Sequence, residues 1–276
     1  MQRQLTTILT IAGSDCSGGA GIQADLRAAA MRGVFTSTAV TAVTVQNSHG
    51  LSDMVVMPQH IVVGQIMAVF QDAIPSAIKI GMVGSLENGI AIARCLKEYA
   101  ATIPIVIDPV MKASSGGNLS ASIETMVDFY KEELCPMATV VTPNLDEAGI
   151  FGASGDSQSE QAIFLLDILN CKAVVLKGGH SDNDAITDVL AIRLEHNDTV
   201  TDTVTSPKID CRNLHGTGCT FSSLMAADMA KGFSIKDAFR SASLTMKDII
   251  AKSSGYSLGC SEYGPLNLFN YHTVQS

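Results

Sequence analysis

Short apolar runs alternate with longer helical patterns from residue 7 to residue 176, and this alternation limits the fold more than any other feature of the sequence. Such alternation is typical of βαβ units, which build a mostly parallel sheet covered by helices. We predict an α/β fold with strands at Thr7–Ala12, Ser37–Val45, Ala77–Ile80, Ile103–Ile107, Thr139–Thr142 and Ala173–Leu176. The helices between them are predicted at Gly21–Arg32, His60–Gln71, Gly89–Glu98, Ser122–Leu134 and Ser159–Leu169.

The C-terminal third of the sequence has a different pattern. Two extended runs, Ala185–Leu194 and Thr199–Pro207, are predicted to be antiparallel edge strands. Helices are predicted at Cys219–Lys231 and Ile235–Ser253, and the tail, Tyr256–Ser276, is predicted to be irregular. The sequence contains no repeat, low-complexity tract or linker, and hydrophobic residues make up 46% of it, which excludes a disordered chain. We therefore predict a single domain over residues 1–276.

The unusual residues of the sequence follow the ends of the predicted strands. In open parallel sheets, ligands bind outside the carboxyl ends of the strands, so a site is expected where such residues gather. The segments concerned are Gly13–Gly21, Gln46–Gly50, Gly81–Met82, Asp108–Val110, Asn144–Glu147 and Lys177–Gly179.

The stretch from His215 to Thr220 is the most informative of the motifs. Its two glycines allow consecutive N–H groups to be presented just where a helix begins, which suits a phosphoryl group carrying developing charge. Cys219 is expected in the first turn, where a helix N-terminus lowers the pKa of a thiol and makes a thiolate plausible. The alternative is an ordinary helix cap with a buried, inert cysteine.

Three polar segments near strand ends have both a functional and a structural interpretation. Asn144 and Glu147 have the spacing of a capping box, which is the favoured interpretation for that pair alone, although Glu147 would also suit Mg²⁺. Asp108 precedes a proline and has the alternative of a turn residue. Lys177 stands beside two glycines, which favours close approach to a phosphate over a solvated side chain.

The first glycine-rich segment is compatible with a ligand cradle. It lacks the lysine of a phosphate-binding P-loop, because Gly19 follows Gly18 at that point. The spacing supports two interpretations equally. One is a backbone cradle for a ligand with Asp25 on the first helical turn, and the other is a plain glycine turn. Gln46 can donate and accept a hydrogen bond at once, which suits an aminopyrimidine edge, whereas the alternative is a polar loop.

Seven segments in the same order resemble the hydroxymethylpyrimidine/phosphomethylpyrimidine kinases of thiamine biosynthesis, a branch of the ribokinase-like fold. They begin at residues 12, 41, 79, 108, 142, 177 and 215 and include AGSDCSGGAGIQAD, TAVTVQN, DPVM, TPNLDE and HGTGCT. The resemblance extends from about Leu9 to about Gly232. It implies two ATP-dependent phosphorylations, first of the hydroxymethyl oxygen of 4-amino-5-hydroxymethyl-2-methylpyrimidine and then of its monophosphate, to give the pyrophosphate.

The resemblance also implies a role for each matching residue. Pyrimidine binding is assigned to Gln46, with Gly13, Asp25, Met82 and Val110 lining the same site. ATP binding is assigned to Lys177, Asn144 and Thr217, and Mg²⁺ binding to Asp108 and Glu147 with help from Asn144. An anion hole is assigned to Gly216, Thr217 and Gly218, and the role of catalytic base to Cys219.

Charge and cysteine content limit which binding partners and which cellular compartment are expected. The net charge is −9 with no run of Lys or Arg, which argues against a nucleic-acid partner. The seven cysteines are odd in number and widely spaced, which favours a reducing cytoplasm over a disulfide framework. No apolar stretch reaches the length of about 18 residues needed to cross a bilayer, and no signal-peptide pattern is present. The edge strands and the resemblance together suggest a homodimer.

Two rival functions remain open at the level of sequence. A pyridoxal/pyridoxine kinase of the same branch also phosphorylates a hydroxymethyl group on an aromatic nitrogen ring, and Gln46 favours the aminopyrimidine over it. A pyrimidine-sensing module without turnover would keep the cradle, but Cys219, Lys177 and the carboxylates argue against it.

Overall fold

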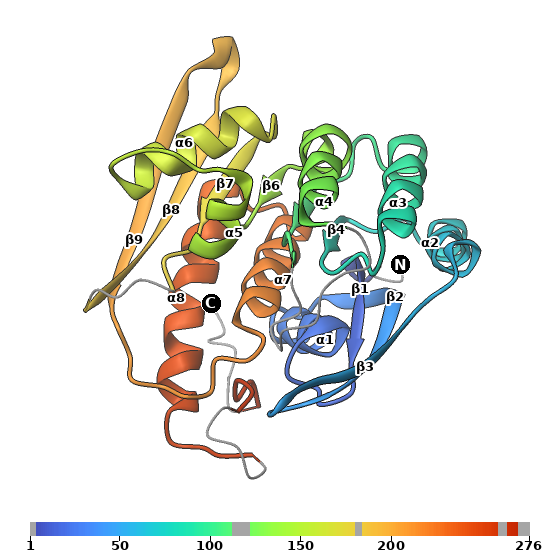
Figure 1. The fold of residues 1–276 in the computed structure, drawn as a ribbon, viewed down its shortest axis with the longest axis horizontal. Helices are drawn as coiled ribbons and strands as arrows, with labels where there is room; N and C mark the ends of the chain where they lie inside the picture. The colour runs from blue at the N-terminus through green and yellow to red at the C-terminus, as the bar shows by residue number, and fades with distance from the viewer. Residues whose placement is uncertain (1–3, 112–121, 180–183, 259–263, 270–276) are drawn as a thin grey trace.

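All strands in the described part of the chain belong to one nine-stranded sheet, seen edge-on between two layers of helices in Figure 1. The structure is a computed structural model and describes residues 4–111, 122–179, 184–258 and 264–269. The strand order is β3-β2-β1-β4-β5-β6-β7-β8-β9, with parallel pairing from β2 to β7 and antiparallel pairing at both edges. The predicted α/β fold, mostly parallel with antiparallel edge strands, is confirmed.

Every predicted strand is present, although β5 and β6 are shorter than predicted and β1 and β2 are longer. The bounds are β1 Thr7–Asp15, β2 Phe35–Asn47, β3 Gly50–Val56, β4 Ala77–Ile80, β5 Ile105–Ile107, β6 Val140–Val141, β7 Ala173–Leu176, β8 Ala185–Arg193 and β9 Thr199–Pro207. β1 extends to Asp15, three residues beyond the prediction. It does so because its pairing with β2 is irregular at Gly13 and then continues through Ser14 and Asp15. A Cβ at Gly13 would lie 2.3 Å from the Met82 Cε, so a larger residue here would push the Met82 side chain aside.

The helices divide between the two faces of the sheet. Buried residues of α1, α7 and α8 form one core cluster, and those of α2 to α6 form the other. Their bounds are α1 Gly21–Met31, α2 Gln59–Asp72, α3 Leu86–Tyr99, α4 Ile123–Phe129, α5 Leu145–Phe151, α6 Gln158–Ile168, α7 Thr217–Ala230 and α8 Ile235–Ser253. Serine begins α3, α4, α6 and α8 by accepting a hydrogen bond from the first turn, which satisfies an otherwise unpaired N–H.

The sequence did not predict β3 or α5, and several helix ends differ from the prediction, most of all the end of α4. In β3, the exposed polar residues Ser52 and Asp53 interrupt the apolar residues, so the strand shows neither a continuous apolar run nor a clear alternation. α5 has only seven residues, too few for a clear periodicity. The predicted helix Ser122–Leu134 is α-helical only to Phe129 and continues as a π-helical turn, Tyr130–Leu134. In the predicted irregular tail, residues 259–263 and 270–276 lie outside the described residues.

The chain changes direction across the sheet at β1. The connection through α1 leads from β1 to β2, whereas the connection through α2 leads back to β4 on the other side of β1. β1 and β4 are adjacent, so their carboxyl ends border a crevice that neither crossover covers. A ligand site is expected at such a switch point.

Candidate active site

Three adjoining cavities lie along the carboxyl ends of the parallel strands. The inner cavity lies at the switch point and is lined by Gly13, Asp15, Gln46, Met82, Val110, His215 and Cys219, among others. The middle cavity shares Val110, His215 and Cys219 with it and adds Asp108, Asn144, Glu147, Lys177 and Gly216–Gly218. The outer cavity shares Asn144, Lys177, Leu214, Thr217 and Gly218 with the middle one. The shared walls make one continuous crevice.

Four of the five residues predicted for the pyrimidine site line the inner cavity, and Asp25 does not. Asp25 is fully buried beneath the cavity, where its carboxylate pairs with Lys79 at 2.9 Å. Thr10 and Ser223 donate further hydrogen bonds to the same carboxylate. Asp25 faces the sheet and α7 rather than the crevice, so its acceptor sites are already filled. A place for Asp25 in the cavity wall is therefore wrong.

Asp15 and His215 are site residues to which the sequence analysis gave no role. The His215 Nε2 lies 2.9 Å from Asp15 Oδ2, and Asp15 also accepts hydrogen bonds from the Ser17 N–H and the Ala20 N–H. Burial alone would raise the pKa of Asp15, but hydrogen bonds from His215, Ser17 and Gln46 hold it well below its usual range. Asp15 is thus an anion that orients the Gln46 side chain toward the inner cavity. Its position directly after the predicted strand was the available signal.

The Lys177–Asp108 ion pair forms the floor of the middle cavity. The Lys177 Nζ lies 2.8 Å from Asp108 Oδ1, and both side chains are largely buried. Gly218 lies against this pair, because a Cβ there would be 3.3 Å from both Asp108 Oδ2 and Lys177 Nζ. The glycine therefore brings the start of α7 and the buried cation to the same wall of the cavity.

The N-terminus of α7 opens into the middle cavity. The helix begins at Thr217, two residues before the predicted start, and Gly216 before it has φ +86°. A Cβ at Gly216 would lie 1.9 Å from the Gly19 carbonyl oxygen, so the turn needs glycine for both its conformation and its space. The Thr217 N–H donates to the Leu214 carbonyl at 3.2 Å. The first-turn amides of Gly218 and Cys219 have no acceptor within the helix, as is general for a helix start, and they suit an anion.

Cys219 lies in the first turn of α7 as predicted, but the expected lowering of its thiol pKa is wrong. Burial raises the pKa of Cys219 to about 12. The positive charge of Lys79 and a hydrogen bond from the Gly21 backbone act in the opposite direction, whereas the Asp25 and Asp108 carboxylates raise the pKa further. The helix start alone does not outweigh the loss of water around the sulfur.

Glu147 caps α5 and also faces the middle cavity. Its Oε2 accepts the Asn144 N–H at 2.9 Å, and the Asn144 Oδ1 accepts the Glu147 N–H at 2.8 Å, which is a complete capping box. Burial raises the pKa of Glu147 to about 7; Lys177 counteracts this rise and the nearby Asp108 carboxylate adds to it. The structural and functional interpretations of this pair are therefore compatible, because a capping carboxylate also lines the cavity.

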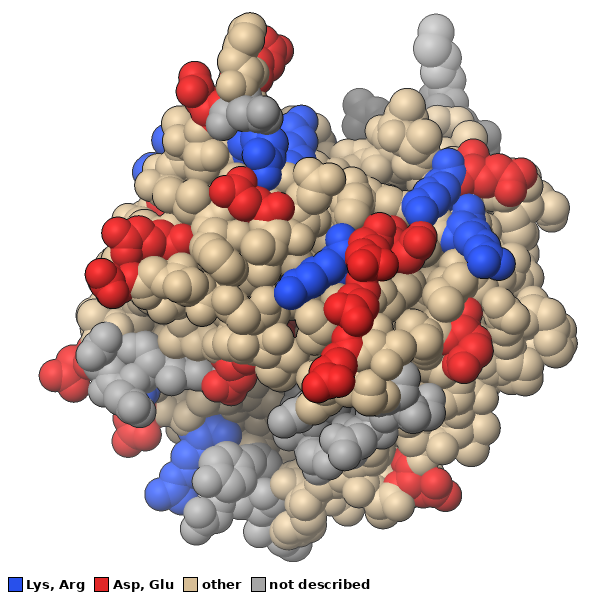
Figure 2. Space-filling view, turned by 45° about the horizontal axis from the view of Figure 1, so that its top comes forward, with Lys and Arg blue, Asp and Glu red and all other residues tan. Residues whose placement is uncertain are grey.

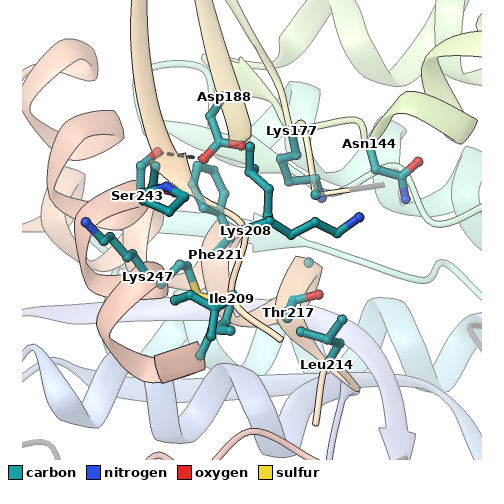
Figure 3. Close-up of a pocket in the computed structure, with 17 residues that line it drawn as sticks. Asn144, Lys177, Asp188, Lys208, Ile209, Leu214, Thr217, Phe221, Ser243 and Lys247 are labelled. Carbon is teal, nitrogen blue, oxygen red and sulfur yellow. Dashed lines mark hydrogen bonds between the residues drawn. The ribbon is translucent and has the colours of Figure 1, made fainter. Parts of the chain in front are cut away.

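The outer cavity combines an apolar pocket with positive charge, and the sequence analysis did not find it (Figure 3). Its apolar wall is made by Ile186, Ile209, Leu214, Phe221, Met246 and Ile250. Lys208 and Lys247 stand at its sides, and Thr217 lies toward the middle cavity. Asp188 is fixed in the wall, since it accepts hydrogen bonds from the Gly178 N–H and the Ser243 hydroxyl, each at 3.0 Å. A flat, partly apolar ring with a charged extension fits this shape.

Comparison with known proteins agrees with this geometry. The family model described as phosphomethylpyrimidine kinase matches residues 15–267. The hydroxymethylpyrimidine/phosphomethylpyrimidine kinase of Haemophilus influenzae is 38% identical over 271 residues, covering 96% of this chain and 97% of that protein. A Staphylococcus aureus pyridoxal kinase in complex with ADP has a TM-score of 0.84 at 28% identity, covering 99% of this chain and 97% of that one. A Clostridium difficile phosphomethylpyrimidine kinase has a TM-score of 0.72 at 33% identity, covering 89% and 99%.

Proposed function

The chain belongs to the phosphomethylpyrimidine kinase family, and we propose that it uses ATP to phosphorylate 4-amino-5-hydroxymethyl-2-methylpyrimidine and then its monophosphate. The single observation that carries the proposal is the continuous crevice, in which the inner cavity beside Gln46 and the outer cavity both adjoin the N-terminus of α7. This layout suits phosphoryl transfer, where catalysis consists mainly of positioning and charge stabilisation. The chain is thus a phosphotransferase of thiamine biosynthesis rather than a binding module without turnover.

Each cavity has a part in the proposed reaction. ATP lies with its base in the outer cavity and its phosphates in the middle one, and the pyrimidine lies in the inner cavity against Gln46. The hydroxymethyl oxygen forms a bond to the γ-phosphorus while the bond from that phosphorus to the bridging oxygen breaks, and ADP leaves. Lys177 and the amides at the start of α7 stabilise the transferred group. Cys219 borders both the inner and the middle cavity, and in its thiolate form it accepts the hydroxyl proton and becomes the thiol.

The residues of the middle cavity fit a magnesium ion, which we propose as part of the active complex. Asp108, Glu147 and Asn144 place oxygen atoms around the same space. No cluster of three or more metal-binding His, Cys, Asp or Glu side chains occurs among the described residues, and Mg²⁺ held partly by phosphates and water needs none. Burial raises the pKa of Glu147 to about 7, and a cation beside this carboxyl would offset that burial. When bound, Mg²⁺ would neutralise phosphate charge.

We further propose a cytoplasmic homodimer of single-domain subunits. Near the β2–β3 turn, apolar side chains are exposed at Val43, Val45 and Val55, with exposed fractions of 45–64%. A second copy covering this patch would remove it from water. Figure 2 displays another face, where acidic and basic side chains are interspersed.

None of the described helices is long and apolar enough to cross a membrane. The six cysteines in the described residues are all free thiols, which fits a reducing compartment.

A substrate panel tests the choice of ring. We expect faster ADP release with the hydroxymethylpyrimidine than with pyridoxal at equal ATP and Mg²⁺, because the Gln46 amide can pair with an aminopyrimidine edge. Mass spectrometry of the products should find the monophosphate first and the pyrophosphate later. Pyridoxal is the appropriate competitor, since solved relatives with similar folds include pyridoxal kinases. Faster turnover of pyridoxal would assign the chain to that activity instead.

Gln46→Ala is expected to raise the KM for the pyrimidine and to leave the KM for ATP nearly unchanged. The side chain lines only the inner cavity and is oriented there by Asp15. Loss of two neutral hydrogen bonds corresponds to roughly a fivefold to hundredfold change, since each contributes about 0.5–1.5 kcal/mol. Steady-state kinetics with each substrate varied in turn measures both constants. Gln71→Ala on the exposed end of α2 serves as the control. Equal effects of Gln46→Ala on both constants would place Gln46 outside the pyrimidine site.

A further inference from the structure

One loop, residues 208–216, contributes to all three cavities of the crevice. It leaves β9 and brings Lys208, Ile209 and Leu214 to the outer cavity (Figure 3). His215 then borders both the inner and the middle cavity, and Gly216 leads into α7. The path of this loop therefore sets the position of the amides at the start of α7.

A short C-terminal segment, residues 264–268, lies beside this loop (Figure 1). We call it the C-terminal strap; its sequence, Gly-Pro-Leu-Asn-Leu, has no role in the proposed reaction. The His215 N–H donates to the Gly264 carbonyl at 3.3 Å, and His215 and Pro265 form an isolated parallel bridge. A Cβ at Gly264 would lie 2.3 Å from Asn213 Oδ1. The strap and the loop are thus in backbone contact, with no space between Gly264 and Asn213.

The strap itself is fixed to the core and to the end of α8. Leu266 and Leu268 are each 5% exposed and belong to the core cluster of α1, α7 and α8. The Asn267 N–H donates to the Ser253 hydroxyl at 2.8 Å. From the loop, the Asn213 amide nitrogen donates to the Ser253 carbonyl at 2.7 Å and to the Tyr256 carbonyl at 2.6 Å. Loop and strap therefore share one anchor at the end of α8.

On its other side the loop rests on the β1–α1 segment. The His215 ring pairs with Asp15 at 2.9 Å and lies over Gly19, where a Cβ would come within 2.1 Å of the ring. The loop is therefore held on one side by the β1–α1 segment, which also forms the inner cavity, and on the other by the strap together with the end of α8. Removing the strap's support would leave the backbone of His215 tied on one side only.

We propose that the C-terminal strap is a positioning element for phosphoryl transfer, holding the 208–216 loop so that the α7 amides face the transferred group. The inference rests on the kinase activity proposed above. The strap lines none of the three cavities of the crevice, so its effect passes through Asn213 and His215 to Gly216. A weakened strap lets the loop and the start of α7 shift, and kcat falls while the fold persists.

Gly264→Ala tests the contact directly. Its Cβ would displace Asn213, and we expect kcat to fall by roughly tenfold to hundredfold, since a shift of about 1 Å in a positioned group costs that order of rate. The thermal midpoint should stay close to that of the wild type. Gly255→Ala is the matched control, because a Cβ there meets nothing within 4 Å. If Gly264→Ala keeps the wild-type kcat, the proposal is overturned.

A second pair of variants decides the question even if Gly264→Ala does not fold. Leu268→Ala loosens the strap, whereas Leu190→Ala on β8 removes the same side chain from the same core cluster and from no cavity wall. When both variants are assayed well below their thermal midpoints, only Leu268→Ala should lower kcat. Equal kcat values for the two variants would mean that the strap only packs against the core, and the proposal would be overturned. Each kcat is taken relative to wild type with whichever acceptor the panel selects. A wrong substrate assignment therefore leaves this comparison intact.

Discussion

Replacing Cys219 by alanine is expected to lower kcat by roughly 10²–10⁴-fold, the range associated with loss of a general base. The side chain stands in the first turn of α7 and borders both the inner and the middle cavity, where the acceptor hydroxyl and the phosphoryl group meet. Gly21 supplies a backbone hydrogen bond to its sulfur. No other thiol in the described residues lines these two cavities.

The raised thiol pKa adds a pH dependence with a definite sign. With a pKa of about 12, Cys219 is protonated at neutral pH. As the pH is raised toward that pKa, the thiolate fraction increases about tenfold for each pH unit. If the thiolate is the base, kcat/KM of the wild type should increase with pH through the neutral range. That increase should disappear in Cys219→Ala, while any inflection from Glu147, whose pKa is raised to about 7, should remain. Alkylation rates of Cys219, followed by mass spectrometry against pH, give an independent measure.

Two controls separate the base from the cavity wall. Cys219→Ser keeps the size and hydrogen bonding of the side chain but is a much weaker acid, so a base role predicts a large loss of kcat for serine too. Cys95→Ala removes a buried thiol from α3, outside the crevice, and should leave kcat unchanged. An unchanged kcat in Cys219→Ala would mean that the amides at the start of α7 carry the step without a base.

The fold was predictable where burial leaves a continuous apolar run. β4, β7 and β9 have the predicted bounds, and β4 and β7 are buried along their whole length. β3 was missed for the opposite reason, because an edge strand held by backbone pairing to β2 needs no apolar face. The carboxyl edge was also predictable, since the order of the strands fixes which loops meet at the switch point.

Less of the site was predictable where a property depends on distant residues. Local sequence places Asp25 in an early turn of α1, but its partner Lys79 comes from β4 and fixes which side it faces. The thiol pKa of Cys219 is set by burial and by charged groups on β4, α1 and the segment after β5, rather than by its own helix. The outer cavity carries no motif at all, because its apolar wall is assembled from β8, α7, α8 and the 208–216 loop.

Lys177→Met is expected to lower kcat by roughly 10²–10³-fold, the usual cost of removing one preorganised group that stabilises developing charge. The Lys177 ammonium borders the middle and outer cavities and lies next to Gly218 at the start of α7. It is positioned by Asp108 at 2.8 Å rather than by solvent. Burial lowers the pKa of Lys177, but the carboxylates of Asp108 and Glu147 raise it by more. The side chain therefore stays positively charged throughout the neutral range.

The same substitution should also destabilise the fold, and the two effects can be measured separately. Breaking a buried ion pair leaves Asp108 without its cation and costs about 3–5 kcal/mol of folding free energy. Assays well below the thermal midpoint remove this contribution from kcat, and calorimetric titration with ADP reports the loss of the phosphate contact. Lys172→Met, an exposed lysine beside β7, is the matched control and should change neither quantity. If Lys177→Met lost only stability and kept the wild-type kcat, the ion pair would be a structural support for Asp108, and charge stabilisation would rest on the α7 amides.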